Sequence, residues 1–242
     1  MAEKVVGILG GMGPEATVEL FRRVVKLTPA RKEQEHLRII IDNNPKIPDR
    51  TRAILESGES PLPLAAETAR NLELAGASFI VIPCNTIHHY IDGIRKSVRI
   101  PVLSMIELTV ERLASTPDVK RVGIVATTGT MKSALYKKAL VKKELEPVEL
   151  EDKTQGKVME AVYRVKESGV DEEVRARVSE AIEKLREMGA DTILLACTEL
   201  SLLYEELRRL GFRVYDALQI LAEETVKYAG LSVNRSAIYF LA

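Results

Sequence analysis

The chain has 242 residues, of which 46% are hydrophobic and 29% are charged, with 35 basic and 35 acidic side chains. This balance argues against disorder and gives no global attraction to nucleic acid or to an anionic membrane. No apolar run reaches the ~20 residues that cross a bilayer, and the strand-like run after Lys4 starts too early for a signal peptide. Two cysteines do not suggest a secreted disulfide scaffold, so we expect a cytoplasmic protein with reduced thiols.

Short β-branched runs alternate along the chain with amphipathic helical stretches. The predicted strands cover 4–9, 37–42, 79–83, 102–104, 122–126, 192–196 and 214–216. The predicted helices cover 15–27, 63–75, 107–114, 132–142, 153–167, 171–188, 199–210 and 218–228. Strands separated by helices of this length predict βαβ units and a parallel sheet.

Two segments depart from this alternation. Residues 44–63 are bounded by prolines and have no strong period, which predicts a loop with one short helix near 51–56. Residues 231–242 break the pattern at the end of the chain and are expected to be an addition to the domain.

The two halves of the sequence match each other. VVGILGGMG aligns with RVGIVATTG, LAGASFIVIPCNT aligns with EMGADTILLACTE, and IPVLS aligns with FRVYD, in the same order and at nearly constant spacing. The second pair superposes Cys84 on Cys197 in a chain that has only these two cysteines. We interpret the match as an internal duplication.

Each cysteine follows the carboxyl end of an equivalent predicted strand and precedes a helix. In open α/β sheets this edge is where ligands bind. Two such halves that face each other would place Cys84 and Cys197 on opposite sides of one cleft. A buried core thiol is the simpler reading of either cysteine alone. A disulfide is the simpler reading of the pair, but a reducing compartment and a substrate-sized gap both disfavour it.

Opposed thiols can perform one particular reaction. The thiolate is the reactive form of cysteine, and its pKa falls at a helix N-terminus. One thiolate can remove a proton from one face of a bound carbon while the opposing thiol delivers a proton to the other face. This reaction inverts a stereocentre without a cofactor, provided that hydrogen-bond donors stabilise the charge that develops.

The glycine-rich stretch near the N-terminus allows a competing reading. Gly11-Met12-Gly13 with Ala16 fits the dinucleotide-binding pattern loosely, but the equivalent loop of the second half, ATTGTMKS, is not rich in glycine. The matched loops are more typical of two walls of a small-anion site. No lysine of the P-loop type follows the glycines, and the histidines His36, His88 and His89 form no metal-binding pattern.

Five motifs in chain order carry a resemblance to a known family: GGMGPEAT, IPDRT, PCNT, ATTGT and ACTEL. Together they resemble the cofactor-independent aspartate racemases of the aspartate/glutamate racemase superfamily, over roughly residues 4–228. The resemblance implies an α/β fold of two similar doubly wound domains, each with a mainly parallel sheet flanked by helices. A pseudo-two-fold axis would relate the domains, which are expected at 1–104 plus 213–242 and at 105–212, with the active site in the cleft between them.

The resemblance also implies roles for individual residues. Cys84 and Cys197 would be the catalytic acid and base, with no metal and no cofactor. Arg50 would grip the side-chain carboxylate of the substrate with Lys166 as its partner, although Lys157 on the same predicted helix is an alternative to Lys166. The other expected substrate-binding residues are Met12, Thr51, Asn85, Thr86, Thr127 and Thr198. A homodimer is expected.

The sequence is compatible with several functions. The leading hypothesis is an aspartate racemase that uses both thiols. Glu199 favours aspartate over glutamate, because glutamate racemases usually carry a histidine at this place. The alternatives are a related racemase, isomerase or decarboxylase acting on glutamate, a hydantoin or another small carboxylate, and a non-catalytic dicarboxylate-binding module. A nicotinamide-dependent dehydrogenase is disfavoured by the weak glycine pattern.

Overall fold

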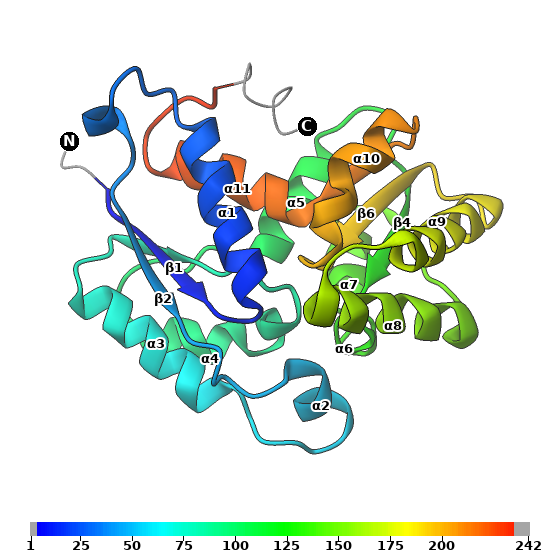
Figure 1. The fold of residues 1–242 in the computed structure, drawn as a ribbon, viewed down its shortest axis with the longest axis horizontal. Coiled ribbons are helices and arrows are strands. Elements are labelled where there is room, and N and C mark those ends of the chain that lie inside the picture. The colour runs from blue at the N-terminus through cyan, green and yellow to red at the C-terminus, as the bar shows by residue number, and fades with distance from the viewer. Residues whose placement is uncertain (1–3, 235–242) are drawn as a thin grey trace.

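The structure is a computed structural model that describes residues 4–234, so most of the segment expected to be an addition to the domain, from 235 on, lies outside the described residues. It contains two parallel sheets, with strand orders β2-β1-β3 and β5-β4-β6-β7 (Figure 1). The strands are β1 Val6–Gly10, β2 Ile39–Asn43, β3 Phe79–Val81, β4 Arg121–Ala126, β5 Glu146–Val148, β6 Thr192–Ala196 and β7 Val214–Asp216. The predicted α/β class is therefore confirmed.

Helices connect the strands and cover both sheets. The α-helices are α1 Pro14–Leu27, α2 Arg50–Leu55, α3 Leu62–Leu74, α4 Ile91–Lys96, α5 Met105–Ala114, α6 Thr128–Lys132, α7 Leu135–Val141, α8 Asp152–Ser168, α9 Glu172–Glu187, α10 Tyr204–Arg209 and α11 Ala217–Tyr228. Within residues 4–234, three 3-10 helices lie at Glu33–Glu35, Thr86–Tyr90 and Leu200–Leu203. Within residues 4–234, no helix has the length and apolar character needed to span a membrane.

The predicted duplication is visible in the topology. In each sheet the first strand along the chain is central, the second lies on one side and the third on the other. Val102 forms a single parallel bridge to Ile80 of β3, at the place that β7 occupies beside β6. The prediction of a strand over 102–104 was therefore too long, since only this bridge forms.

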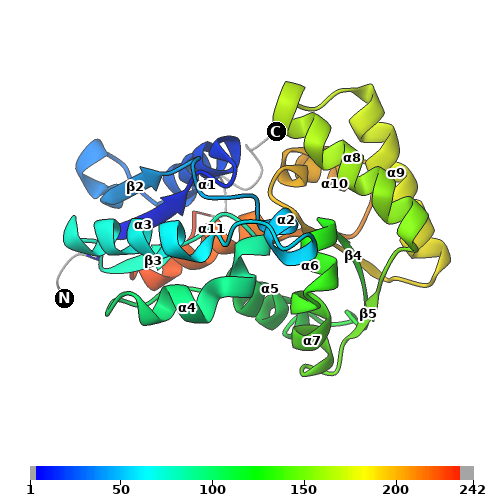
Figure 2. The same ribbon diagram turned by 90° about the horizontal axis from the view of Figure 1, so that it is seen from below.

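Alternation along the strands places buried side chains in three apolar layers. Val6 and Ile8 of β1 face a central core, which also contains Val122 and Ile124 of β4 and the inner faces of α1, α5 and α11. Outer cores lie between the first sheet and α3 and between the second sheet and α8 and α9. Both sheets are thus covered on two faces, as parallel sheets require, and Figure 2 shows α8 and α9 beyond the second sheet.

We call the sheet β2-β1-β3 with α1–α4 the first half and the sheet β5-β4-β6-β7 with α6–α10 the second half. Helices α5 and α11 pack against each other, and α11 also packs on α1. The division into 1–104 plus 213–242 and 105–212 stays a prediction. β7 is hydrogen-bonded within the second sheet, whereas α11, which follows it directly, packs on α1 of the first half.

Candidate active site

A small cavity lies between the two halves, at the carboxyl ends of the central strands. It has a volume of about 10 Å³ and is lined by Met12, Asp49, Arg50, Thr51, Cys84, Asn85, Thr86, Thr127, Lys166, Cys197, Thr198 and Glu199. All ten site residues expected from the sequence line this cavity. Asp49 and Glu199 line it as well and were not among them.

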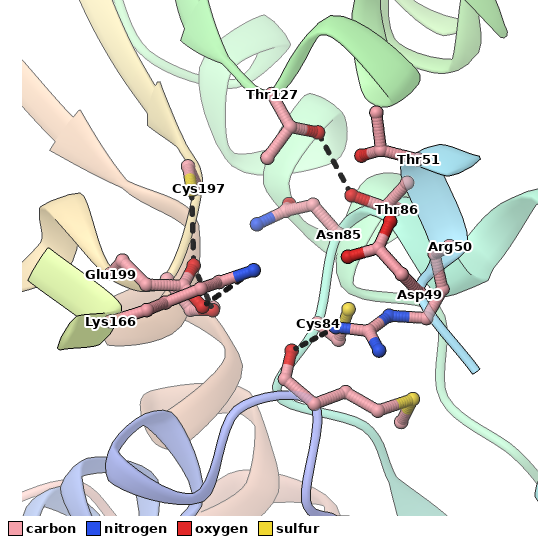
Figure 3. A pocket seen from close by; sticks show the side chains of 12 residues that line it. Asp49, Arg50, Thr51, Cys84, Asn85, Thr86, Thr127, Lys166, Cys197 and Glu199 are labelled. Carbon is pink, nitrogen blue, oxygen red and sulfur yellow. Dashed lines mark hydrogen bonds and ion pairs between the residues drawn. The ribbon is translucent and has the colours of Figure 1, made fainter. Parts of the chain in front are cut away.

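The two cysteines reach the cavity from different halves. Cys84 follows β3, and Cys197 follows β6 directly; both are free thiols, with relative exposures of 4% and 2%. Figure 3 shows their sulfur atoms on different walls of the cavity. Sequence reasoning expected a helix N-terminus behind each thiol, and the structure has short 3-10 helices, Thr86–Tyr90 and Leu200–Leu203, at these places.

Cys197 has an acidic neighbour. Its Sγ donates a hydrogen bond to Glu199 Oε2 at 3.1 Å, and Glu199 Oε1 lies 3.8 Å from Lys166 Nζ (Figure 3). Burial raises the pKa of the Cys197 thiol well above its usual range. The Glu199 carboxylate raises this pKa further, while Lys166 opposes the effect. Cys197 therefore rests as a thiol.

The backbone of Cys84 is held by a histidine. The amide of Met105, the first residue of α5, donates to His88 Nε2 at 2.9 Å, so the proton of the neutral ring is on Nδ1. Nδ1 donates to the Cys84 carbonyl at 2.8 Å. Burial lowers the pKa of His88 to about 4, which keeps the ring neutral at physiological pH. His88 thus ties the Cys84 segment to the start of α5.

Arg50 is held at the cavity wall by backbone carbonyls. Its guanidinium donates to the carbonyl of Met12 at 3.1 Å and to that of Pro48 at 3.2 Å, and the buried Nε has no partner in the described structure. Asp49 accepts from the Arg52 amide at 2.8 Å and so caps the N-terminus of α2, the short helix that carries Arg50. The proline-bounded loop therefore presents a cation to the cavity.

Small polar groups form another part of the cavity wall. Thr86 hydrogen-bonds to Thr127 at 2.9 Å and to Thr130 at 3.0 Å, which joins the two halves beside the cavity. Asn85 Oδ1 accepts from the phenol of Tyr136 at 2.6 Å, and its Nδ2 is buried without a partner in the described structure. Such an unpaired buried donor is costly unless a ligand accepts from it.

The two lysines of α8 lie in different places. Lys166 lines the cavity, with its side chain 30% exposed. Lys157 forms an ion pair with Glu180 of α9 at 2.6 Å and lines a separate surface hollow with it. Of these two lysines, Lys166 is therefore the one at the cavity, and its contact with a substrate stays a prediction.

A second and larger cavity of about 580 Å³ adjoins the first. The two share Asp49, Arg50, Lys166, Thr198 and Glu199, and the larger one continues outward along the first turn of α1 and the end of α8. Charged side chains thus lie where the small inner cavity meets the larger outer one. A substrate larger than one water molecule requires the inner cavity to open.

The glycine-rich loop has a packing explanation. Gly11 has a φ of 94°, and a Cβ there would lie 2.3 Å from the backbone carbon of Asn44. Only glycine permits this approach of the loop to the end of β2.

Among residues 4–234, no group of three His, Cys, Asp or Glu side chains is arranged to hold a metal ion.

Residues 9–225 match the family described as Asp/Glu/Hydantoin racemase. The chain belongs to this family. An aspartate racemase from Picrophilus torridus has a similar structure, with a TM-score of 0.87 and 30% identity, over 98% of this chain and 99% of that one.

Relatives within this racemase family differ in their described substrates. The broad specificity amino-acid racemase RacX of Bacillus subtilis is 27% identical over 91% of this chain and 96% of its own length. The glutamate racemase of Aquifex aeolicus is 27% identical over 70% of this chain and 65% of its own length. The family therefore establishes the fold and the racemase class. The substrates named for these relatives differ, so they do not identify one amino acid as the substrate.

Proposed function

We propose that the protein interconverts L- and D-aspartate without a cofactor, by proton transfer at Cα between Cys84 and Cys197. The observation that carries the proposal is that the only two cysteines of the chain line one small cavity from opposite halves. The same cavity presents the cations Arg50 and Lys166. A racemase must handle a proton on both faces of one carbon, and a pair of opposed thiols meets this requirement.

The polar groups have matching roles in this proposal. Arg50 and Lys166 stabilise the side-chain carboxylate of aspartate, while Asn85 Nδ2 and the hydroxyls of Thr86, Thr127 and Thr198 surround the α-carboxylate and amino group. Met12 and Thr51 complete the wall. The carbanionic charge that develops on the substrate is stabilised by these fixed donors.

The deciding experiment uses heavy water. The protein is incubated without cofactor with L-aspartate, D-aspartate, L-glutamate and L-alanine, and both deuterium at Cα and enantiomer ratio are measured. We expect exchange with inversion for aspartate, and glutamate racemisation at a similar or higher rate would assign the substrate to the glutamate alternative. Binding of dicarboxylates without any exchange would support the non-catalytic module instead.

Variants connect the activity to the site. Cys84→Ala and Cys197→Ala should each lower racemisation at least about 10²-fold while retaining the fold. Lys166→Ala should raise the KM for aspartate, and Lys157→Ala on the same helix is the matched control, expected to behave as wild type. Full turnover by either cysteine variant would contradict the mechanism.

The homodimer and the cytoplasmic location stay predictions.

A further inference from the structure

The duplicated cysteines have different electrostatic surroundings. The S–H of Cys197 donates a hydrogen bond to the Glu199 carboxylate at 3.1 Å. Within the described residues, no hydrogen bond reaches the sulfur of Cys84, and His88 contacts the Cys84 carbonyl instead. The two halves therefore match in topology but not in charge at the thiols.

Charged side chains from both halves lie around Cys197. Glu199 approaches it from the segment after β6, and Lys166 of α8 pairs with Glu199 at 3.8 Å. Asp49 and Arg50 line the same cavity from the first half, where Asp49 caps α2 and Arg50 donates to backbone carbonyls. The carboxylate that touches the sulfur is thus that of Glu199.

A carboxylate at this distance has a defined effect. Ionisation of Cys197, which is 2% exposed, would place a buried thiolate against the Glu199 carboxylate and would break the hydrogen bond that the S–H donates. Repulsion between like charges is strong where water is excluded. Glu199 has 10% side-chain exposure, so solvent screens it weakly.

We propose that Glu199 holds the proton on Cys197 and so makes Cys197 the proton donor and Cys84 the base of the free enzyme. Glu199 acts by positioning a proton. Only the consequence of this role for catalysis rests on the proposed function. In that reaction, the Cα–H bond breaks as Cys84 forms an S–H bond, and the proton of Cys197 forms the new Cα–H bond. The free enzyme would then be ready for the enantiomer whose Cα–H faces Cys84.

The consequence for thiol ionisation is measurable without any activity. The variant Cys84→Ser reports on Cys197 alone, and Cys197→Ser reports on Cys84 alone. Thiolate absorbance near 240 nm and iodoacetamide alkylation are followed against pH in each, with and without Glu199→Gln. We expect Glu199→Gln to lower the midpoint for Cys197 by about one pH unit or more and to move that of Cys84 much less.

The control is Glu167→Gln, which removes a carboxylate that lines only the outer cavity. It should leave both midpoints unchanged. An unchanged or raised midpoint for Cys197 in Glu199→Gln, or equal shifts for both thiols, would overturn the proposal. Circular dichroism and thermal unfolding verify that each variant is folded.

The intact enzyme supplies a second readout. If Cys84 must be ionised and Cys197 protonated in free enzyme, the alkaline limb of kcat/KM against pH reports Cys197. Glu199→Gln should move this limb to lower pH, and Glu167→Gln should not. A wild-type protein without racemase activity would refute the proposed function but leave the thiol titrations interpretable, whereas an active enzyme with unmoved titrations would refute the role of Glu199 alone.

Discussion

The phenol of Tyr136, on α7 of the second half, donates to Asn85 Oδ1 of the first half at 2.6 Å. This bond fixes which end of the Asn85 amide faces the cavity, because the oxygen is already occupied. The remaining Nδ2 is buried without a partner in the described structure and is available to a substrate oxygen. A side chain outside the cavity thus orients a donor inside it.

Tyr136→Phe tests this relationship, because phenylalanine fills the same buried space without the hydroxyl. We expect kcat/KM for the racemised amino acid to fall about tenfold and the free energy of unfolding to fall by about 1 kcal/mol. Steady-state kinetics and urea unfolding measure the two effects. Tyr204→Phe on α10, away from the cavity, is the control and should leave kcat/KM unchanged. Wild-type kinetics in Tyr136→Phe would show that Asn85 is oriented by other contacts.

The two halves approach each other closely at a glycine beside the cavity. A Cβ at Gly129 in α6 would lie 2.8 Å from Thr51 Oγ1 and 3.0 Å from Thr51 Cα, which is backbone of α2. Gly129→Ala should therefore hold the halves apart at the cavity and raise KM about tenfold, since the substrate would be enclosed less completely.

The matched control for Gly129→Ala is Gly156→Ala in α8, where a Cβ would meet nothing within 4 Å. Alanine in a helix interior is favoured over glycine by about 0.5–1 kcal/mol, so this variant should raise the melting temperature with unchanged kinetics. A KM for Gly129→Ala equal to that of the control would show that the contact between α2 and α6 plays no part in binding.

His88 makes the stability depend on pH. Its pKa is about 4 in the folded protein and about 6.5 when exposed, so below pH 6.5 the unfolded chain binds a proton that the folded one does not. Stability is therefore fully present above pH 6.5 and is lost as the pH falls toward 4, by up to about 3 kcal/mol.

Urea unfolding between pH 7 and pH 4.5 measures this loss. His88→Gln removes the titrating ring, so its stability should be lower than wild type at pH 7 but should decline less steeply with acid. His89→Gln replaces the adjacent exposed histidine and should retain the wild-type slope. If the slope is the same in His88→Gln, other groups control the acid sensitivity.

Much of the fold was predictable because local and long-range signals agree. The buried runs of β4 and β6 are flanked by amphipathic helices, and the duplication fixes which strands are equivalent. The strand β5 was missed because Pro147 interrupts its short run, and proline is tolerated there at a sheet edge. The single helix expected over 132–142 is split at Ala134, whose φ of 53° no periodicity reveals.

The site was predictable where a sequence motif follows the end of a predicted strand. The ten expected residues follow strand ends or lie in the proline-bounded loop and α8, and all of them reach one cavity. Asp49 was missed because a lone carboxylate is most simply solvent-exposed. Glu199 was noted from the resemblance as a sign of substrate preference, but its position in the cavity wall was not predicted. His88 and Tyr136 act through contacts with residues distant in the sequence or with the backbone, which spacing alone does not show.

A buried ion pair connects the first half to the segment after Cys197. The guanidinium of Arg23 on α1 contacts Asp216 at the end of β7 and donates to the carbonyl of Ser201 at 2.9 Å. Asp216 also accepts from the Ser201 hydroxyl at 2.6 Å and from the Leu218 amide at 3.1 Å, which caps α11. Arg23 and Asp216 are 3% and 1% exposed, so neither charge is solvated.

Arg23→Met should therefore destabilise the protein by about 3–5 kcal/mol, since it leaves the Asp216 carboxylate buried without its cation. Arg22→Met is the control, because Arg22 pairs with Glu19 with its own side chain 40% exposed and should cost about 1 kcal/mol or less. Urea unfolding at pH 7 compares the two. Equal losses would mean that Asp216 is stabilised by its other donors, and the connection between α1 and the Cys197 segment would then rest on apolar packing alone.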